Sequence, residues 1–462
     1  MARTDRRSST PSSRHLIFIF CLWKVLLLGL AAFCPGPGYD TSAYILFDRS
    51  TARHHNAADL SRVDRLTLNL FRWDALYFVD AADRGQIHEQ QWAFSWAYSH
   101  LLRISGQFFS GAAACPLRYY IVAGIIVSNV CHLLSALVLY RLLALVVDVR
   151  LQRHVAFVAA VLHILTPASL FMSAPYAEAI FSLLNMTGMF CYAQSKLTAT
   201  RGHASFLEDA YKLTSGAFFA SATLMRSNGL LSGFILLYDV ASYMPRIVSM
   251  QLNYHNVRSI VVTCVAGMFI IGGFVGPQYV AYQEFCSREG DSDPRAWCEK
   301  SIPSIYSWVQ SQYWNVGLFR YWTISNLPLF VLAAPVLWLL LESSVATLRT
   351  GLEVLQRQSH VSKAGRDATQ KVPRFAVIAL PELALPQLIL AVAAITSFHV
   401  QIVNRIASGY PTWYVAIAQM LVNGSATPSS GEATMKGQWI VRGMIMYTLV
   451  QGMLYANFLP PA

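Results

Sequence analysis

The chain has 462 residues, of which 55% are hydrophobic and only 13% are charged, and its formal net charge is +11. A soluble protein averages about 25% charged residues, so this composition excludes an ordinary soluble domain and indicates a protein of the lipid bilayer. The positive charge does not indicate a nucleic-acid partner, because the basic residues lie in short segments between long apolar runs.

The chain begins with a basic segment, residues 1–15, followed by an apolar run at 16–34. The run is long enough to cross a bilayer. A cleaved signal peptide is one interpretation, since the small residues Ala31 and Ala32 lie near its end. We favour an uncleaved signal-anchor whose basic segment stays in the cytosol by the positive-inside rule. Both interpretations put the chain after Cys34 on the lumenal side.

Further apolar runs long enough to span a membrane lie at 119–147, 154–173, 176–194, 258–281, 326–343, 375–398 and 437–458. The stretch 211–243 is longer and is interrupted by the sequence RSNG at 226–229. As one helix it would bury Arg226 in the membrane, at a cost of about 2.5–3.5 kcal/mol on insertion scales. As a hairpin of two short helices it would bring RSNG to one side.

The loop 344–374, with its six Lys and Arg residues, decides between these two interpretations. A hairpin at 211–243 returns this basic loop to the cytosol, as the positive-inside rule requires, whereas a single crossing puts it in the lumen. We therefore expect an all-α polytopic membrane protein with about ten crossings and both termini in the cytosol. The helices then occupy 119–281 and 326–462, and the lumenal segments are 35–118, 282–325 and 399–436.

The first lumenal segment, 35–118, is too long for a simple connector and contains two clusters of polar and aromatic residues. These are FRWDALYFVDAADRG at 71–85 and HEQQWAFSW at 88–96. We expect short interfacial helices here, one of them at 90–102.

Asp74 is the candidate catalytic residue of this segment. On a helix it shares a face with Tyr77 and Phe78, at i+3 and i+4. A carboxylate beside Trp73 at a membrane surface is partly desolvated, which suits a general base. The alternative is an aspartate that caps an interfacial helix among belt aromatics.

Cys286 and Cys298 flank a short polar segment within 282–325. No zinc pattern accompanies them, so we expect a disulfide in an oxidising lumen. Asp291 and Asp293, which lie between the two cysteines, are typical of a solvated turn. We expect no metal site in the chain.

Four blocks of sequence resemble the family of the second GPI mannosyltransferase, in the same order along the chain. They are RWDALYF with GQIHEQQWAFS (72–95), LMRSNGLLSGF (224–234), the stretch from Cys286 to Pro335, and NRIASGYPTWY (404–414). The third contains YWNVGLFRYW, which is more specific than WDA, since very short motifs match by chance. AFSWAYS at 93–99 departs from the family, which leads us to expect a proline after AFS.

The resemblance implies a GT-C type glycosyltransferase of the endoplasmic reticulum membrane with a lumenal active site. It implies transfer of the second mannose, in α-1,6 linkage, from dolichyl-phosphate mannose to the GPI-precursor glycolipid, without a cofactor. A β-linked donor that gives an α product implies inversion by direct displacement, with one base. Asp74 matches the acidic residue that the family places in its first lumenal loop. The family also leads us to expect a small accessory membrane subunit.

The leaving phosphate needs positive charge, and a guanidinium can donate two parallel hydrogen bonds to it. Arg405, Arg226 and Arg320 are the candidates, and each lies in a block that resembles the family. Asn228, beside Arg226 in RSNG, joins them as a candidate for substrate binding. The alternative for each arginine is snorkelling or an ion pair between helices.

Glu89 is the second carboxylate candidate, for acceptor hydroxyls or an arginine. Trp73 and Trp314 are candidates for stacking on sugar rings, although an aromatic belt is the alternative. Two other functions remain open, a lipid or sugar transporter or flippase and a non-catalytic subunit of a lipid-glycosylation complex. Only Glu178 and Arg226 hint at a polar transport path.

Overall fold

The computed structural model describes residues 12–35, 40–51, 61–112, 115–147, 152–200, 206–287, 295–363, 380–423 and 431–459. These residues form helices joined by turns, with no strand among them, so the all-α prediction is confirmed. Within these ranges, four helices are long and apolar enough to cross a membrane: α1 (Ser13–Phe33), α6 (Leu117–Val146), α12 (Tyr254–Cys286) and Ile324–Glu353, which overlaps α14 (Leu327–Lys363). The total of about ten crossings stays a prediction.

The other α-helices are α2 (Ser42–Thr51), α3 (Arg62–Leu70), α4 (Asp74–Arg84), α5 (Trp96–Ser110), α7 (Gln152–Ile164), α8 (Glu178–Thr200), α9 (Phe206–Met225), α10 (Gly233–Ala241), α11 (Met244–Val248), α13 (Ile305–Tyr313), α15 (Leu385–Thr396), α16 (Val403–Ile406), α17 (Thr412–Asn423) and α18 (Gly431–Ala456). Short 3-10 helices are η2 (Glu89–Ala93), η3 (Ser227–Ser232), η4 (Ile324–Asn326), η5 (Pro381–Ala384), η6 (Val400–Ile402) and η7 (Ala407–Gly409).

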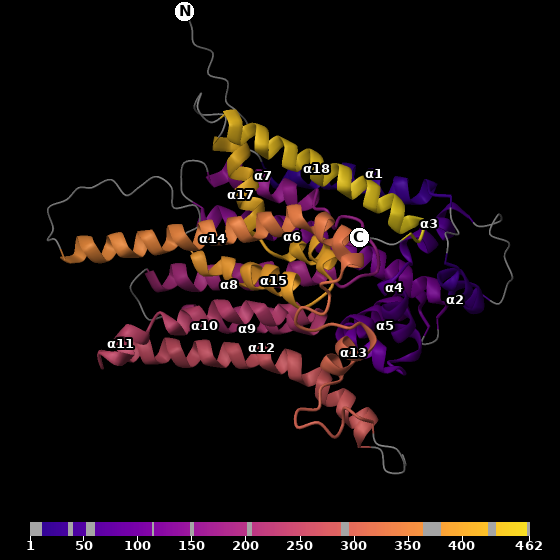
Figure 1. Ribbon diagram of the computed structural model, residues 1–462, viewed down its shortest axis with the longest axis horizontal. Coiled ribbons are helices and arrows are strands. Elements are labelled where there is room, and N and C mark those ends of the chain that lie inside the picture. The colour runs from indigo at the N-terminus through magenta and orange to yellow at the C-terminus, as the bar shows by residue number, and fades with distance from the viewer. Residues whose placement is uncertain are drawn as a thin grey trace, which may run out of the picture.

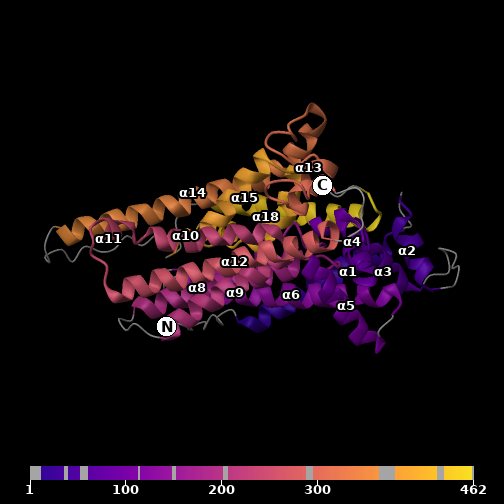
Figure 2. The ribbon, with the colours of Figure 1, turned by 90° about the horizontal axis from the view of Figure 1, so that it is seen from below.

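The long helices lie side by side in one elongated bundle (Figures 1 and 2). Helices α2, α3, α4, α5 and α13 gather at one end of it, and α11 lies at the opposite end. Small residues let α9 and α12 approach closely. A Cβ added to Gly216 would lie 2.7 Å from Ala266, and one added to Gly273 would lie 2.6 Å from the carbonyl oxygen of Ala220.

The long apolar stretch 211–243 is divided at the polar sequence RSNG. Helix α9 ends at Met225, Arg226 takes an extended conformation, and η3 and the nine-residue α10 follow. Arg226 therefore lies just after a helix end, where its guanidinium is 2.8 Å from the Glu178 carboxylate. The sidedness of the loops stays a prediction, and residues 364–374 of the basic loop lie outside the described residues.

The predicted span at 154–173 is only partly helical. Helix α7 ends at Ile164, and 165–177 runs as turns. Lys24 of α1, which is buried, donates to the carbonyl oxygens of Ser169 (3.1 Å) and Met172 (3.4 Å). Irregular backbone at membrane depth is tolerated where protein groups satisfy its carbonyls. Lys24 supplies that compensation.

The segment 399–436, which we predicted to be lumenal, contains a helix that the sequence analysis did not predict. This helix is α17, and it packs against α7, α14 and α18. The twelve residues of α17 are too few to count as a span by length. Because of this additional helix, α18 runs in the opposite direction to the one that the sequence analysis predicts. The Tyr455 hydroxyl donates to the carbonyl oxygen of Leu70 at 2.9 Å, so α18 ends beside the start of α4.

Helix α1 also reaches that end of the bundle with its final turn, where the Ala31 carbonyl accepts from Asn69 at 2.9 Å. The chain thus enters α1 at one end and leaves α18 at the other. The expectation that both termini lie on one side is corrected accordingly.

The predicted interfacial helix at 90–102 is two elements, η2 and α5. Ser95 separates them, and its hydroxyl accepts from the backbone N–H of Tyr98 at 2.9 Å as the N-cap of α5. Trp96 is therefore the first helical residue. Proline is favoured at the first helical position. The proline expected from the family and the Trp96 of this chain therefore fit the same backbone path.

Candidate functional site

The site begins at the first residue of α4, Asp74. The preceding residue, Trp73, has φ 53°, a region that bulky side chains rarely adopt. Such strain persists only where the surroundings determine the conformation. The Trp73 ring packs on Phe458 with centroids 5.1 Å apart, and the Tyr176 hydroxyl donates to the Arg72 carbonyl at 3.0 Å. These contacts fix the turn that starts α4 and thereby place Asp74.

Four charged side chains from four distant segments form one network. Asp74 Oδ2 lies 2.7 Å from Nη2 of Arg405. Arg405 Nε lies 2.7 Å from Glu178 Oε1, and Nη1 of Arg226 lies 2.8 Å from the same oxygen. Asp74 is the most accessible, with 28% of its side chain exposed, whereas Glu178 is 1% exposed. Two carboxylates and two guanidinium groups balance in charge.

Glu178 was not among the sequence-predicted site residues. It opens α8 directly after the buried turns 165–177, and a carboxylate is favourable at a helix N-terminus. The sequence signal for Glu178 is an acidic residue shortly after Pro175, at the start of an apolar run. This pattern alone does not distinguish a transport path from a catalytic site. The guanidinium of Arg405 also lies over the Phe171 and Tyr176 rings, 5.3 and 5.4 Å from their centroids.

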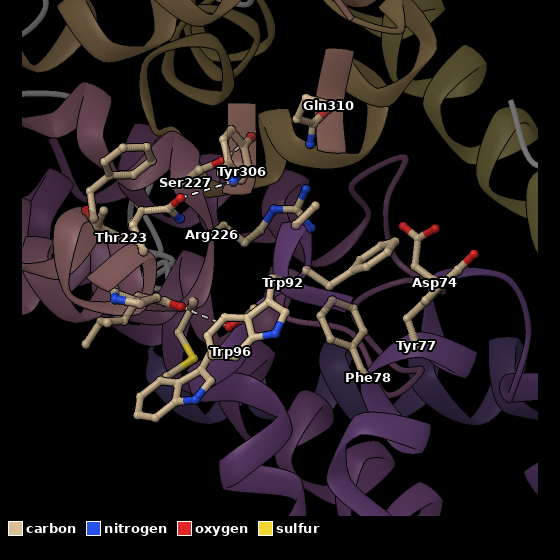
Figure 3. Close-up of a pocket in the computed structure, with 18 of the residues that line it drawn as sticks. Asp74, Tyr77, Phe78, Trp92, Trp96, Thr223, Arg226, Ser227, Tyr306 and Gln310 are labelled. Atoms are coloured by element: carbon tan, nitrogen blue, oxygen red, sulfur yellow. Dashed lines mark hydrogen bonds between the residues drawn. The ribbon is translucent and has the colours of Figure 1, made fainter. Parts of the chain in front are cut away.

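A cavity of about 270 Å³ opens beside this network (Figure 3). Asp74, Arg226 and Arg405 all line it. Its remaining walls come from α4, η2, α5, α9, α12, α13 and the segment around Ile402. It therefore lies where all the blocks of distinctive sequence converge.

Aromatic side chains form one wall of this cavity. Tyr77 stacks on Phe94 with centroids 4.5 Å apart and planes at 16°, and Phe94 meets Trp314 edge-on at 5.4 Å. Trp314 thus lines the cavity, and its stacking on a sugar ring stays a prediction. Trp73 is not among the lining residues and packs on Phe458 instead.

Glu89 lies outside the cavity and ties η2 to the loop around α13. It accepts hydrogen bonds from Arg295 Nη1 (2.7 Å) and Trp297 Nε1 (3.0 Å) and, at 3.3 Å each, from Trp308 and Tyr313. Burial raises the pKa of Glu89, but the hydrogen bonds from Arg295 and Trp297 outweigh burial, and the pKa lies below its usual value. Glu89 is therefore an ionised group that joins η2 to α13, and its contact with Arg295 fits the second of the two predicted roles. Binding of acceptor hydroxyls stays a prediction.

The other two substrate-binding candidates do not line the cavity. Asn228 donates to the Tyr410 hydroxyl at 3.0 Å, which joins RSNG to the segment after α16. Arg320 is exposed and is not among the lining residues. Of the three arginine candidates, only Arg226 and Arg405 face Asp74's cavity.

Cys286 and Cys298 are bonded in the structure, which joins the end of α12 to the turns before α13. Between 12 and 459, the described ranges hold no group of three or more His, Cys, Asp or Glu arranged to bind a metal ion. Asp291 and Asp293 lie outside the described residues.

Comparison with known proteins gives a match over nearly the whole chain. Residues 14–462 match the family model described as mannosyltransferase (PIG-V). GPI mannosyltransferase 2 of Aspergillus fumigatus is 38% identical over 456 residues, which is 97% of this chain and 93% of the relative. The Aspergillus oryzae protein of the same name is 37% identical, over 100% of this chain and 99% of that one.

Among solved structures, the apo form of the Archaeoglobus fulgidus oligosaccharyltransferase is similar, with a TM-score of 0.49 and 12% identity. The match covers 97% of this chain but 56% of that longer one. A likeness this distant carries no conclusion about the site.

Proposed function

The chain belongs to the mannosyltransferase (PIG-V) family and is a membrane glycosyltransferase of GPI-anchor assembly; from this premise we propose its reaction, donor and base. It transfers the second mannose, in α-1,6 linkage, from dolichyl-phosphate mannose to the GPI-precursor glycolipid. The reaction takes place at the lumenal face of the endoplasmic reticulum membrane. The fold is then of the GT-C type, and the reaction needs no cofactor.

The observation that carries the proposal is a carboxylate and two guanidinium groups at one cavity. Asp74 is accessible there, while Arg405 and Arg226 share the buried Glu178. Positive charge stabilises the negative charge that grows on the leaving phosphate, and a guanidinium matches phosphate geometry. A carboxylate within reach of the acceptor hydroxyl serves as the general base.

The reaction is one inverting displacement. The acceptor hydroxyl oxygen attacks the anomeric carbon of mannose, and the bond from that carbon to the phosphate oxygen breaks. The bonding electrons leave with dolichyl phosphate, whose added negative charge is met by Arg405 and Arg226. The hydroxyl proton goes to Asp74.

In the structure, Asp74 forms an ion pair with Arg405, at 2.7 Å. A donor phosphate that binds Arg405 would take the place of this carboxylate in the ion pair. The phosphate then supplies the negative charge that pairs with Arg405, and Asp74 is released to accept a proton. Donor binding therefore prepares the base.

The test is transfer by the purified full-length chain. It is incubated with labelled dolichyl-phosphate mannose and a GPI precursor that carries one mannose, with GDP-mannose as the comparison donor. We expect one added mannose that an α-1,6-specific mannosidase removes, and no product from GDP-mannose. A product of another linkage, or transfer from GDP-mannose alone, would overturn the proposal.

A further inference from the structure

A second cavity, of about 440 Å³, lies next to the first, between α2, α4 and η2. Tyr77 lines both cavities. Ligand sites for small molecules are commonly about 300–1,000 Å³, so this cavity is large enough for sugar rings.

One face of α4 connects the two cavities. Asp74, Tyr77, Asp80 and Arg84 follow one another at intervals of three, three and four residues, which puts them on the same side of a helix. The first two line the cavity with the arginines, and the last three line the second cavity. A ligand in the second cavity therefore has a continuous path along α4 to the proposed base.

The polar wall of the second cavity is an ordered cluster of planar side chains. Asp80 accepts from Arg84 Nε at 2.8 Å and from Gln91 Nε2 at 2.8 Å. The Asp80 side chain is only 14% exposed, so these hydrogen bonds hold it in place. His88 and Gln90 complete this wall, and His88 is exposed.

The rest of the lining is apolar. Leu46 of α2 and Leu76 of α4 contribute to it, together with the Tyr77 ring. Sugar rings present hydroxyl groups at their edges and C–H groups on their faces. A carboxylate, a guanidinium and amides beside apolar side chains can satisfy both, which makes a sugar a better match than an acyl chain.

We propose that the second cavity binds the sugar headgroup of the acceptor glycolipid; this rests on the function proposed above. In a direct displacement, the acceptor hydroxyl approaches the anomeric carbon from the side opposite the leaving phosphate. The phosphate belongs with Arg226 and Arg405 in the first cavity. The acceptor must therefore reach Asp74 from another direction, and the α4 path from the second cavity provides one.

The test measures KM separately for acceptor and donor in the purified full-length chain. The variants are His88→Ala, Gln90→Ala and Arg84→Ala, whose side chains are exposed or half-buried. Each lost hydrogen bond should raise the acceptor KM about three- to tenfold. The KM for dolichyl-phosphate mannose and the slow hydrolysis of the donor without acceptor should not change.

Gln312→Ala is the matched control for Gln90→Ala. Gln312 is an exposed glutamine in the last turn of α13 and lines neither cavity. It should leave both KM values unchanged. Transfer by the unmutated chain, with an acceptor KM in all three cavity variants equal to that of the control, would overturn the cavity assignment alone. Absence of transfer by the unmutated chain would instead overturn the proposed function and the acceptor site with it.

Discussion

Glu178 holds two arginines through a single carboxylate oxygen, at 2.7 Å from Arg405 and 2.8 Å from Arg226. Its side chain is almost completely buried, so no water replaces these contacts. When Asp74 leaves Arg405 for the acceptor proton, Glu178 still holds both guanidinium groups side by side. We therefore regard Glu178 as a positioning residue for phosphate binding.

Glu178→Gln should weaken donor binding more than it slows the chemical step. The substitution removes the charge that orients both arginines and leaves them uncompensated, which costs about 3–5 kcal/mol when a buried pair is broken. We expect the donor KM to rise at least about tenfold and the thermal midpoint to fall. Glu382→Gln is the control, since Glu382 is equally buried but bonds Tyr192 away from the cavity.

An unchanged donor KM in Glu178→Gln would show that the arginines keep their places without it. A loss of stability with unaltered KM would assign Glu178 a purely structural role. The Glu382→Gln control should retain the unmutated donor KM.

Glu89 gives a pH dependence with a definite sign. Its pKa in the folded protein lies below the usual 4.5, because the hydrogen bonds from Arg295 and Trp297 outweigh the effect of burial. A lowered folded-state pKa contributes stability above the unfolded-state pKa, and this contribution is lost as pH falls through the folded value. The clamp between η2 and α13 should thus hold at neutral pH and weaken below about pH 4.5.

The measurement is the thermal midpoint of the unmutated chain and of Glu89→Gln from pH 7 down to pH 4. The unmutated chain should be more stable at pH 7, and the difference should shrink as the pH drops. A difference that stays constant over this range would mean that the charge of Glu89 does not support the clamp.

At the scale of elements, α5 shows how a departure from the family pattern is accommodated. Ser95 is extended, at φ −67° and ψ 111°, and caps the helix that Trp96 begins. An extended residue is what a following proline requires. The chain path needs no proline because the Ser95 cap already fixes the start of α5.

Trp96→Pro should therefore be about as stable as Trp96→Ala, within about 1 kcal/mol, since the first helical position tolerates proline. The same exchange inside α5, His100→Pro compared with His100→Ala, should cost about 3 kcal/mol. Thermal unfolding of the four variants gives both differences. Equal losses at the two positions would place the start of α5 elsewhere.

Several elements were predictable from local pattern. The charge and glycine of RSNG predicted the break at 226–229, because Arg226 is costly inside a membrane helix. Helix α17 escaped prediction because twelve apolar residues fall short of a span. The buried turns 165–177 were not predicted either. Their backbone carbonyl groups accept hydrogen bonds from Lys24, which is far away in the sequence.

The site shows the same division. The sequence predicted Asp74 because aromatic residues surround it. It predicted Arg226 and Arg405 because each lies in a block that resembles the family. Arg320 lies in an equally distinctive block yet is exposed and away from the cavity. Which arginine faces the Asp74 carboxylate depends on the packing between helices that are distant in the sequence. A local sequence pattern does not contain this information.

At the scale of the whole molecule, the direction of α18 decides the topology. Tyr455 donates to Leu70, so the chain leaves the bundle at the end where Asp74 lies. A glycosylation acceptor tag at the C-terminus should therefore be modified if the active site is lumenal, while one at the N-terminus should not. A tag inserted into 344–363 should also remain unmodified.

An unmodified C-terminal tag in a chain that retains activity would contradict this arrangement. The N-terminal tag is the negative control. A tag at 35–61, a segment predicted to be lumenal, serves as the positive control for modification.

The central claim is that Asp74 is the base of mannosyl transfer, and the most direct measurement is the single-turnover rate of Asp74→Asn with saturating donor and acceptor. We predict a rate about 10²–10⁴ times lower than that of the unmutated chain. Donor affinity should not weaken, because Arg405 no longer has Asp74 as a competing partner. Asp83→Asn, an exposed carboxylate on the same helix, should keep the unmutated rate. A rate for Asp74→Asn within a few-fold of the unmutated chain would contradict the account.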